Sequence, residues 1–157
     1  MTKPTSTRAD GDRYEKLTMK WHQRRDIPCR LTHASGQLRR KWDDWRADLD
    51  VGKDGTRWLW KVEVKSRSDS QGWKRLDAWL GGNDVLVLGT GFVLLSEHGY
   101  DRLWGGVPSP MVAKTDGSTA IVEGFLSNAD LAILWHGETF SAFCAWETFV
   151  KMISGRN

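Results

Sequence analysis

The segment from residue 56 to residue 67 constrains the fold most, because its side chains alternate between two kinds. Bulky apolar residues occupy one set of alternate positions, namely Trp58, Trp60, Val62 and Val64. Mostly charged residues occupy the other set, namely Leu59, Lys61, Glu63, Lys65 and Arg67. Successive residues of a strand point to opposite faces, so this alternation predicts a strand with one face on a core and a polar face opposite.

A shorter stretch before this strand alternates in the same way. Residues 47–51, Ala-Asp-Leu-Asp-Val, place Asp48 and Asp50 on one face of a strand. Residues 52–55, Gly-Lys-Asp-Gly, are typical of a hairpin turn. Pairing across that hairpin is expected to bring an aspartate onto the surface that carries Glu63 and Lys65. The pattern leaves open whether Asp48 or Asp50 is the closer residue.

The remaining pattern predicts an α/β (α+β) domain, a central mixed sheet flanked by helices. Helices are expected at residues 12–25, 72–81 and 147–153, and strands at residues 29–32, 85–88, 92–95, 120–122, 131–135 and 140–145. Residues 105–117 are expected to form a Gly- and Pro-containing connection. Residues 80–88 resemble residues 126–134, which we interpret as two similar loop-to-strand junctions rather than a repeat.

Composition bounds the class of protein. The 157 residues, 39% of them hydrophobic, fit a single domain over residues 11–157, with core motifs at 11–90 and completion at 91–157. Residues 1–10 are predicted to be a disordered basic arm. No apolar run approaches the roughly 20 residues that span a bilayer, so a cytoplasmic protein without membrane contact is expected. Two distant cysteines and dispersed histidines argue against a disulfide framework or structural zinc.

The charge is unevenly distributed along the chain. Residues 1–75 hold 19 Lys and Arg against 11 Asp and Glu, a net charge of +8, whereas residues 76–157 hold 4 against 9, a net charge of −5. A basic surface attracts polyanions, and phosphate contacts supply most non-specific affinity for nucleic acid. The first half is therefore the expected nucleic-acid surface, although charge runs are more often simply solvated.

Carboxylates gathered beside a lysine suggest a specific chemistry. Repelling carboxylates are costly to hold together unless a cation neutralises them, and an all-oxygen site suits Mg²⁺, for which Mn²⁺ can substitute. Such an ion activates water and stabilises charge on a scissile phosphate. A nearby lysine can orient that water or bind the phosphate.

These residues resemble the PD-(D/E)XK nuclease superfamily, and within it the Holliday-junction-resolvase-like enzymes of archaea, phages and mobile elements. The similar segments are residues 11–15, Arg30, residues 35–36, residues 47–49, residues 63–67 and residues 73–88. Ala47 stands where the superfamily name has proline. The resemblance implies a restriction-endonuclease-like core with Asp48, Glu63, Glu15 and the Val64 carbonyl as metal ligands. It also implies that Lys65 positions the attacking water and that Ser35 is the polar residue of a catalytic loop.

The resulting functional hypothesis is a Mg²⁺-dependent endonuclease that hydrolyses DNA phosphodiester bonds, selective for branched DNA such as Holliday junctions. A homodimer is expected because resolving a junction needs two symmetric cuts. The candidate DNA-binding residues are Arg30, Arg39, Arg40, Lys41 and Arg67. The alternatives are a restriction-like, nicking or repair nuclease of the same superfamily, and an inactive DNA-binding module.

Several residues also have structural interpretations. Glu63 and Lys65 fit a cross-strand ion pair on an exposed sheet face, a contact of little energetic value. Asp12 and Glu15 fit a capping box, with Asp12 as the N-cap of the first helix, as well as they fit a metal-binding Glu15.

Overall fold

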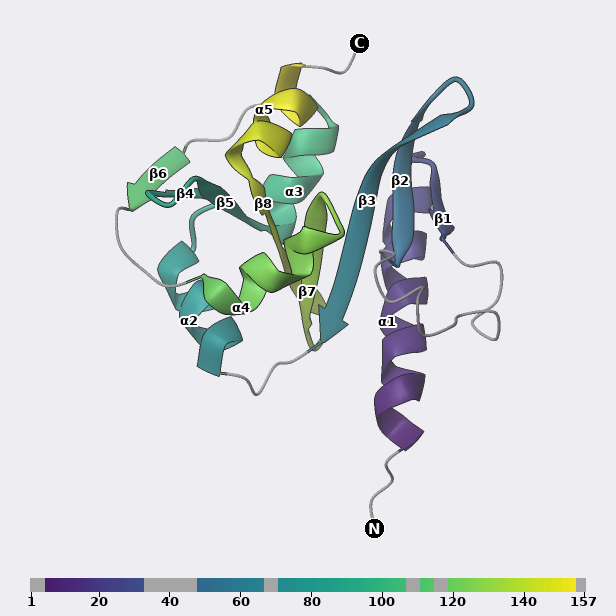
Figure 1. Cartoon of the computed structure of the whole chain (residues 1–157), viewed down its shortest axis with the longest axis horizontal. Helices are drawn as coiled ribbons and strands as arrows, with labels where there is room; N and C mark the ends of the chain where they lie inside the picture. Colours follow the sequence, from purple (N-terminus) through teal and green to yellow (C-terminus); the bar gives the residue numbers. More distant parts are fainter. Residues whose placement is uncertain (1–4, 33–47, 67–70, 107–110, 115–118, 155–157) are drawn as a thin grey trace.

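The computed structural model describes residues 5–32, 48–66, 71–106, 111–114 and 119–154. The elements are, in chain order, α1 (Thr5–Gln23), β1 (Cys29–Leu31), β2 (Leu49–Asp54), β3 (Arg57–Ser66), α2 (Gln71–Leu80), β4 (Val85–Leu88), β5 (Phe92–Ser96), α3 (Glu97–Trp104), β6 (Met111–Lys114), α4 (Ala120–Glu123), the 3-10 helix η3 (Gly124–Ser127), β7 (Leu131–His136), β8 (Thr139–Ala145) and α5 (Trp146–Ser154). Figure 1 shows their arrangement. Among these helices none is both long and apolar enough to cross a membrane.

The described strands form one mixed sheet of eight, in the order β1-β2-β3-β7-β8-β5-β4-β6. Two neighbouring pairs are parallel, β3 with β7 and β4 with β6, and the other neighbours are antiparallel. The prediction of a mixed α and β fold with a central mixed sheet is therefore confirmed. The strand that follows α2 does not return beside β3, because β7, β8 and β5 lie between β3 and β4.

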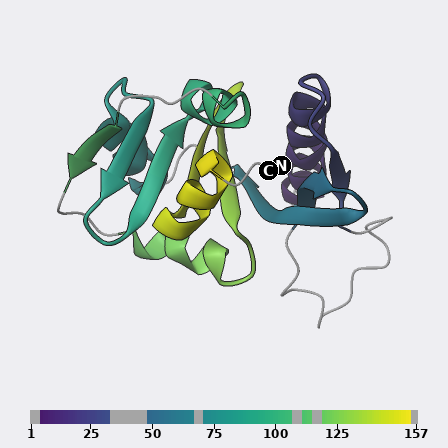
Figure 2. The ribbon, with the colours of Figure 1, turned by 90° about the horizontal axis from the view of Figure 1, so that it is seen from above.

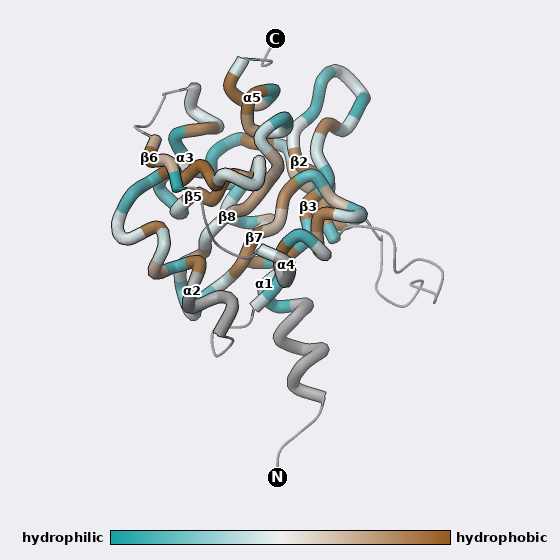
Figure 3. Tube along the Cα trace, turned by 60° about the vertical axis from the view of Figure 1, so that its left-hand side comes forward, coloured by the Kyte–Doolittle hydropathy of each residue, from teal (hydrophilic) through white to brown (hydrophobic). Residues whose placement is uncertain are grey.

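Helices cover both faces of this sheet. On one face α1, α3 and α5 pack against a cluster that includes Trp21, Val62, Tyr100, Leu131 and Phe149. On the other face α2, α4 and η3 pack on a second cluster, to which β1, β2 and β3 contribute none of their described residues. Figure 2 shows α1 against β1 to β3, and Figure 3 shows hydrophobic residues along β5, β7 and α5. On this second face β3 carries Leu59 together with the charged residues Lys61, Glu63 and Lys65.

A buried hydrogen-bond network fixes α1 on the sheet. His22 Nδ1 lies 2.8 Å from the Thr18 carbonyl oxygen, and because a carbonyl only accepts, Nδ1 carries the proton. Nε2 then accepts from the Tyr100 hydroxyl at 2.7 Å. Trp135 Nε1 on β7 donates to Thr18 Oγ1 at 2.8 Å. Desolvation of this buried imidazole lowers the pKa of His22 to about 4, so the ring is neutral near pH 7.

The first helix begins earlier than the sequence predicts. Residues 5–10 were expected to be part of a disordered arm, but they form the first turns of α1. Residues 5–10 contain neither proline nor glycine, and Pro4 stands just before the helix, where a missing N–H costs nothing.

Three expectations in the second half were wrong or incomplete. Residues 120–122, expected as a strand, are α4, because a short apolar run has no periodicity that separates a strand from a helix turn. The expected connection at 105–117 contains β6. Helix α3 was not predicted; its N-cap Ser96 accepts a hydrogen bond from the Gly99 N–H at 2.9 Å.

Candidate functional site

Asp48 lies just before β2 and is attached to β3 by its main chain and its side chain. Its N–H donates to the Val62 carbonyl at 3.0 Å, and its Oδ2 accepts from the Val64 N–H at 2.8 Å. Thr32 donates to the Asp48 carbonyl through both its N–H and its Oγ1, each at 3.0 Å. Asp48 is therefore bonded to both chain neighbours of Glu63, and the residue is 7% exposed.

Glu63 and Lys65 lie on β3, on the face opposite Val62 and Val64. The two valines are buried in the core under α1, as the alternation predicted. Lys65 Nζ lies 3.4 Å from Glu63 Oε2, and the two side chains are 34% and 18% exposed. An ion pair therefore stands beside the anchored Asp48 carboxylate, partly open to solvent.

The Val64 carbonyl is directed toward the same edge of β3. The N–H and C=O of one strand residue point to the same side of the strand. Since the Val64 N–H points to Asp48, its carbonyl oxygen faces the Asp48 edge and not β7. Hard oxygen donors from Asp48 and Val64 therefore lie on one side of β3, next to the Glu63 side chain.

Asp50 is in a different electrostatic environment from Asp48. Arg30 Nε lies 3.1 Å from its Oδ2, and Lys61 Nζ lies 3.6 Å from its Oδ1. The carboxylate is buried, and the Arg30 guanidinium also lies 4.7 Å from the Trp58 ring centre. Two cations thus balance the charge of Asp50, which suits a structural ion-pair network.

Glu15 lies within α1, half-buried, and does not complete a cluster with the strand carboxylates. Among the described residues no group of three or more His, Cys, Asp or Glu is placed to hold a metal ion together. The capping-box interpretation of Glu15 is wrong, because α1 begins at Thr5 and Asp12 lies inside it.

Five predicted residues lie outside the described part of the chain, namely Ser35, Arg39, Arg40, Lys41 and Arg67. Of the candidate DNA-binding residues, Arg30 is described, with more than half of its side chain exposed beside Asp50.

Two residues that contact the site, Thr32 and Phe125, were not predicted from the sequence. Thr32 holds the main chain of Asp48, and the sequence placed it only at the end of the strand expected at residues 29–32. Phe125, on η3, places its ring centre 5.1 Å from Lys65 Nζ. The signal for Phe125 was the resemblance between residues 80–88 and 126–134, since Phe125 immediately precedes the second of these segments.

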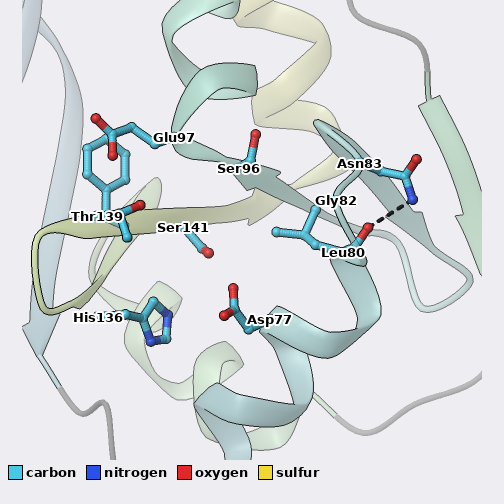
Figure 4. Close-up of a pocket in the computed structure, with 10 residues that line it drawn as sticks. Asp77, Leu80, Gly82, Asn83, Ser96, Glu97, His136, Thr139 and Ser141 are labelled. Atoms are coloured by element: carbon cyan, nitrogen blue, oxygen red, sulfur yellow. Dashed lines mark hydrogen bonds between the residues drawn. The ribbon is translucent and has the colours of Figure 1, made fainter.

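A pocket of about 280 Å³ opens elsewhere on the molecule, where α2 ends, α3 begins and β7 turns into β8. Figure 4 shows Asp77, His136 and Ser141 among its lining residues. Glu97, which also lines it, accepts a hydrogen bond from Trp21 Nε1 at 3.1 Å. The pocket does not include Asp48, Glu63 or Lys65, so it is separate from the candidate site.

No protein-family model matches the chain, and neither the curated proteins nor the solved structures contain a significant match.

Proposed function

We propose that this protein is a metal-dependent endodeoxyribonuclease whose active site is formed by Asp48, Glu63, Val64 and Lys65. One observation carries the proposal: the Asp48 carboxylate is bonded to the Val64 N–H, so it is held beside the Glu63–Lys65 pair. A carboxylate, a second carboxylate and a lysine on adjacent positions are the groups that the sequence resemblance assigns to catalysis in PD-(D/E)XK nucleases. The restriction-endonuclease-like core belongs to the same proposal.

The donor set fits a hard divalent cation. Asp48, Glu63 and the Val64 carbonyl supply oxygen, and Mg²⁺ is typically held by one or two carboxylates, with waters and substrate phosphates completing its shell. The absence of a three-residue ligand cluster among the described residues is compatible with this mode of binding. When bound, such an ion supplies an activated water and stabilises charge on the scissile phosphate.

The chain's own groups have distinct roles in this proposal. The Val64 N–H donates to the Asp48 carboxylate and restricts the rotation of that side chain. Lys65, paired with Glu63, presents a partly exposed ammonium that binds a phosphate oxygen or orients the water. The net charge of +8 on residues 1–75, which include all four residues, attracts the DNA backbone.

Selectivity for branched DNA and a homodimeric assembly are the finer parts of the proposal. Both rest on the resemblance to Holliday-junction-resolvase-like enzymes, in which two symmetric cuts need two active sites. A restriction-like, nicking or repair nuclease uses the same groups on a different substrate.

The test is a cleavage assay with four-way junction, flap, duplex and single-stranded DNA, with Mg²⁺ and with EDTA. The wild-type protein is compared with Glu63→Gln and with Lys61→Gln, a matched control that removes a charge two residues away on the same face. We expect cleavage only with Mg²⁺, abolished in Glu63→Gln and retained in Lys61→Gln.

The outcomes separate the candidate functions. Residual cleavage by Glu63→Gln at the wild-type rate would exclude the proposed site. Equal cleavage of linear duplex and junction would replace the resolvase function by another nuclease. DNA binding without any cleavage would favour the inactive DNA-binding module.

A further inference from the structure

The chain from β3 onward consists of two similar units. Each unit has the order strand, helix, two-stranded hairpin, helix. The first comprises β3, α2, β4, β5 and α3, and the second comprises β6, α4 with η3, β7, β8 and α5. The resemblance between residues 80–88 and 126–134, first interpreted as two loop-to-strand junctions, covers the start of the hairpin in each unit.

The strand pairings relate the two units by an approximate twofold axis. The hairpins meet through β5 and β8, which pair antiparallel at the centre, with Leu94 opposite Phe143. Next to β5 lies β4, and next to β8 lies β7. The outer strand β6 of the second unit then pairs in parallel with β4 of the first, and β3 of the first unit pairs in parallel with β7 of the second. The first strand of each unit is therefore exchanged between units.

The helices of the two units are related by the same approximate twofold axis. Tyr100 and Leu103 of α3 occupy the positions that Phe149 and Met152 occupy in α5, and all four are buried in one core. On the opposite face Leu76 of α2 corresponds to Val122 of α4, and both are buried in the second core. These corresponding helix residues are therefore buried in both units.

One side-chain contact is repeated as well. Lys65 is opposite Leu134 on β7, and Lys114 is opposite Leu88 on β4, the corresponding residue of the other unit. Lys65 Nζ lies 5.1 Å from the Phe125 ring centre, and Lys114 Nζ lies 5.9 Å from that of Trp79. Phe125 and Trp79 are themselves corresponding residues, each directly preceding the repeated leucine.

The units differ where the candidate site has its carboxylates. The position of Glu63, two residues before the lysine, is taken in the second unit by Val112, which is 41% exposed. Among the described strands, β2 pairs with the outer edge of β3, and none pairs with the outer edge of β6. The second unit therefore has the lysine and the aromatic ring, with an apolar residue at the position of Glu63.

We propose that the second unit completes the active site of the first, with Phe125 as the positioning residue of Lys65. This inference rests on the proposed function. The face of an aromatic ring attracts an ammonium group, and the attraction is directional. Glu63 holds the ammonium from its own strand and Phe125 holds it from the opposite unit, so the two contacts fix its position beside the carboxylates.

The repeated contact supplies a matched control for the test. Phe125→Leu and Trp79→Leu each remove an aromatic ring from a lysine at corresponding places in the two units. Only the first of these lysines belongs to the proposed active site. We expect Phe125→Leu to lower kcat for DNA cleavage about three- to tenfold with an unchanged KM, and Phe125→Trp, which restores an aromatic face, to recover the rate.

Thermal unfolding of all variants separates positioning from stability. Trp79→Leu is expected to lower the Tm at least as much as Phe125→Leu, because Trp79 is the larger ring, while its kcat stays at the wild-type value. Equal loss of kcat in both variants would show a general packing effect and overturn the assignment, as would an unchanged kcat in Phe125→Leu. If the wild-type protein cleaves DNA and Glu63→Gln does not, either of these results refutes only the role of Phe125 and leaves the proposed function intact. If the wild-type protein does not cleave DNA, the proposed function itself is refuted.

Discussion

His22 gives the protein a pH dependence of stability that is set by its burial. The imidazole is fully buried, and it is held neutral between the Thr18 carbonyl and the Tyr100 hydroxyl. Desolvation is the largest cause of its lowered pKa, which is about 4 in the folded protein against an ordinary value of 6.5. In the unfolded chain the ring is solvated and takes up a proton near the ordinary value.

The sign and size of the effect follow from proton linkage. Between pH 6.5 and pH 4 the unfolded state binds the proton and the folded state does not, so the contribution of His22 to stability falls as the pH falls. The full shift corresponds to about 3 kcal/mol, and about 2 kcal/mol of it is already lost on going from about pH 8 to about pH 5. Below the folded pKa the loss stops growing.

The assay is urea unfolding followed by tryptophan fluorescence, at pH values of about 8 and about 5, for the wild-type protein and His22→Gln. Other titrating groups remain in both proteins, so the difference between their pH dependences isolates His22. We expect the wild-type protein to lose about 2 kcal/mol more than the variant over this range. Equal losses would refute the assignment of a buried, neutral imidazole.

Three further predictions follow from burial and packing. Asp50→Asn leaves two cations beside a neutral amide, so the free energy of unfolding should fall by about 1–3 kcal/mol in urea titrations while any DNA cleavage persists. Gly99→Ala would press a methyl group against the carbonyl oxygen of Asp84, at the end of the loop between α2 and β4, and a loss of about 1–3 kcal/mol is expected in thermal unfolding. Gly124→Ala, which meets open space, is the control and should leave the Tm nearly unchanged. Burial raises the pKa of Cys29 and of Cys144 to about 12, so a thiol reagent at pH about 8 should label neither until urea unfolds the chain, and rapid labelling of the native protein would contradict this.

Local patterns predicted much of the sheet, since they depend on neighbouring residues alone. The alternation along β3 correctly predicted that Val62 faces the core and Glu63 faces the opposite side, because successive side chains of a strand alternate. The hairpin with β2 was predicted from its glycines, but the turn lies at residues 55–56 and not at 52–55, because the strand pairing continues to Asp54 opposite Arg57. Periodicity failed at residues 120–122, where four helical residues carry too few positions to show a period of 3.6.

The choice between the two aspartates could not come from the strand pattern. Asp48 and Asp50 are two residues apart, so the period of a strand places both on the same face. What separates them is tertiary: Asp50 meets Arg30 from one neighbouring strand and Lys61 from the other, whereas Asp48 meets the Val64 N–H. Neither set of contacts is visible before β1, β2 and β3 are paired.

The order of the strands explains why the site depends on residues far from its motifs. The resemblance to known nucleases covers residues 11–90, yet within that range β3 gains only one neighbour, β2. Its second edge pairs with β7, and Asp130, just before β7, makes two hydrogen bonds of 2.8 Å with Lys61. The Lys61 N–H donates to Asp130 Oδ2, and the Asp130 N–H donates to the Lys61 carbonyl. A strand bonded along both edges holds its side chains more rigidly than an edge strand, and catalytic groups need such support. The part of the chain after residue 90, to which the resemblance does not extend, therefore stabilises the strand that carries Glu63 and Lys65.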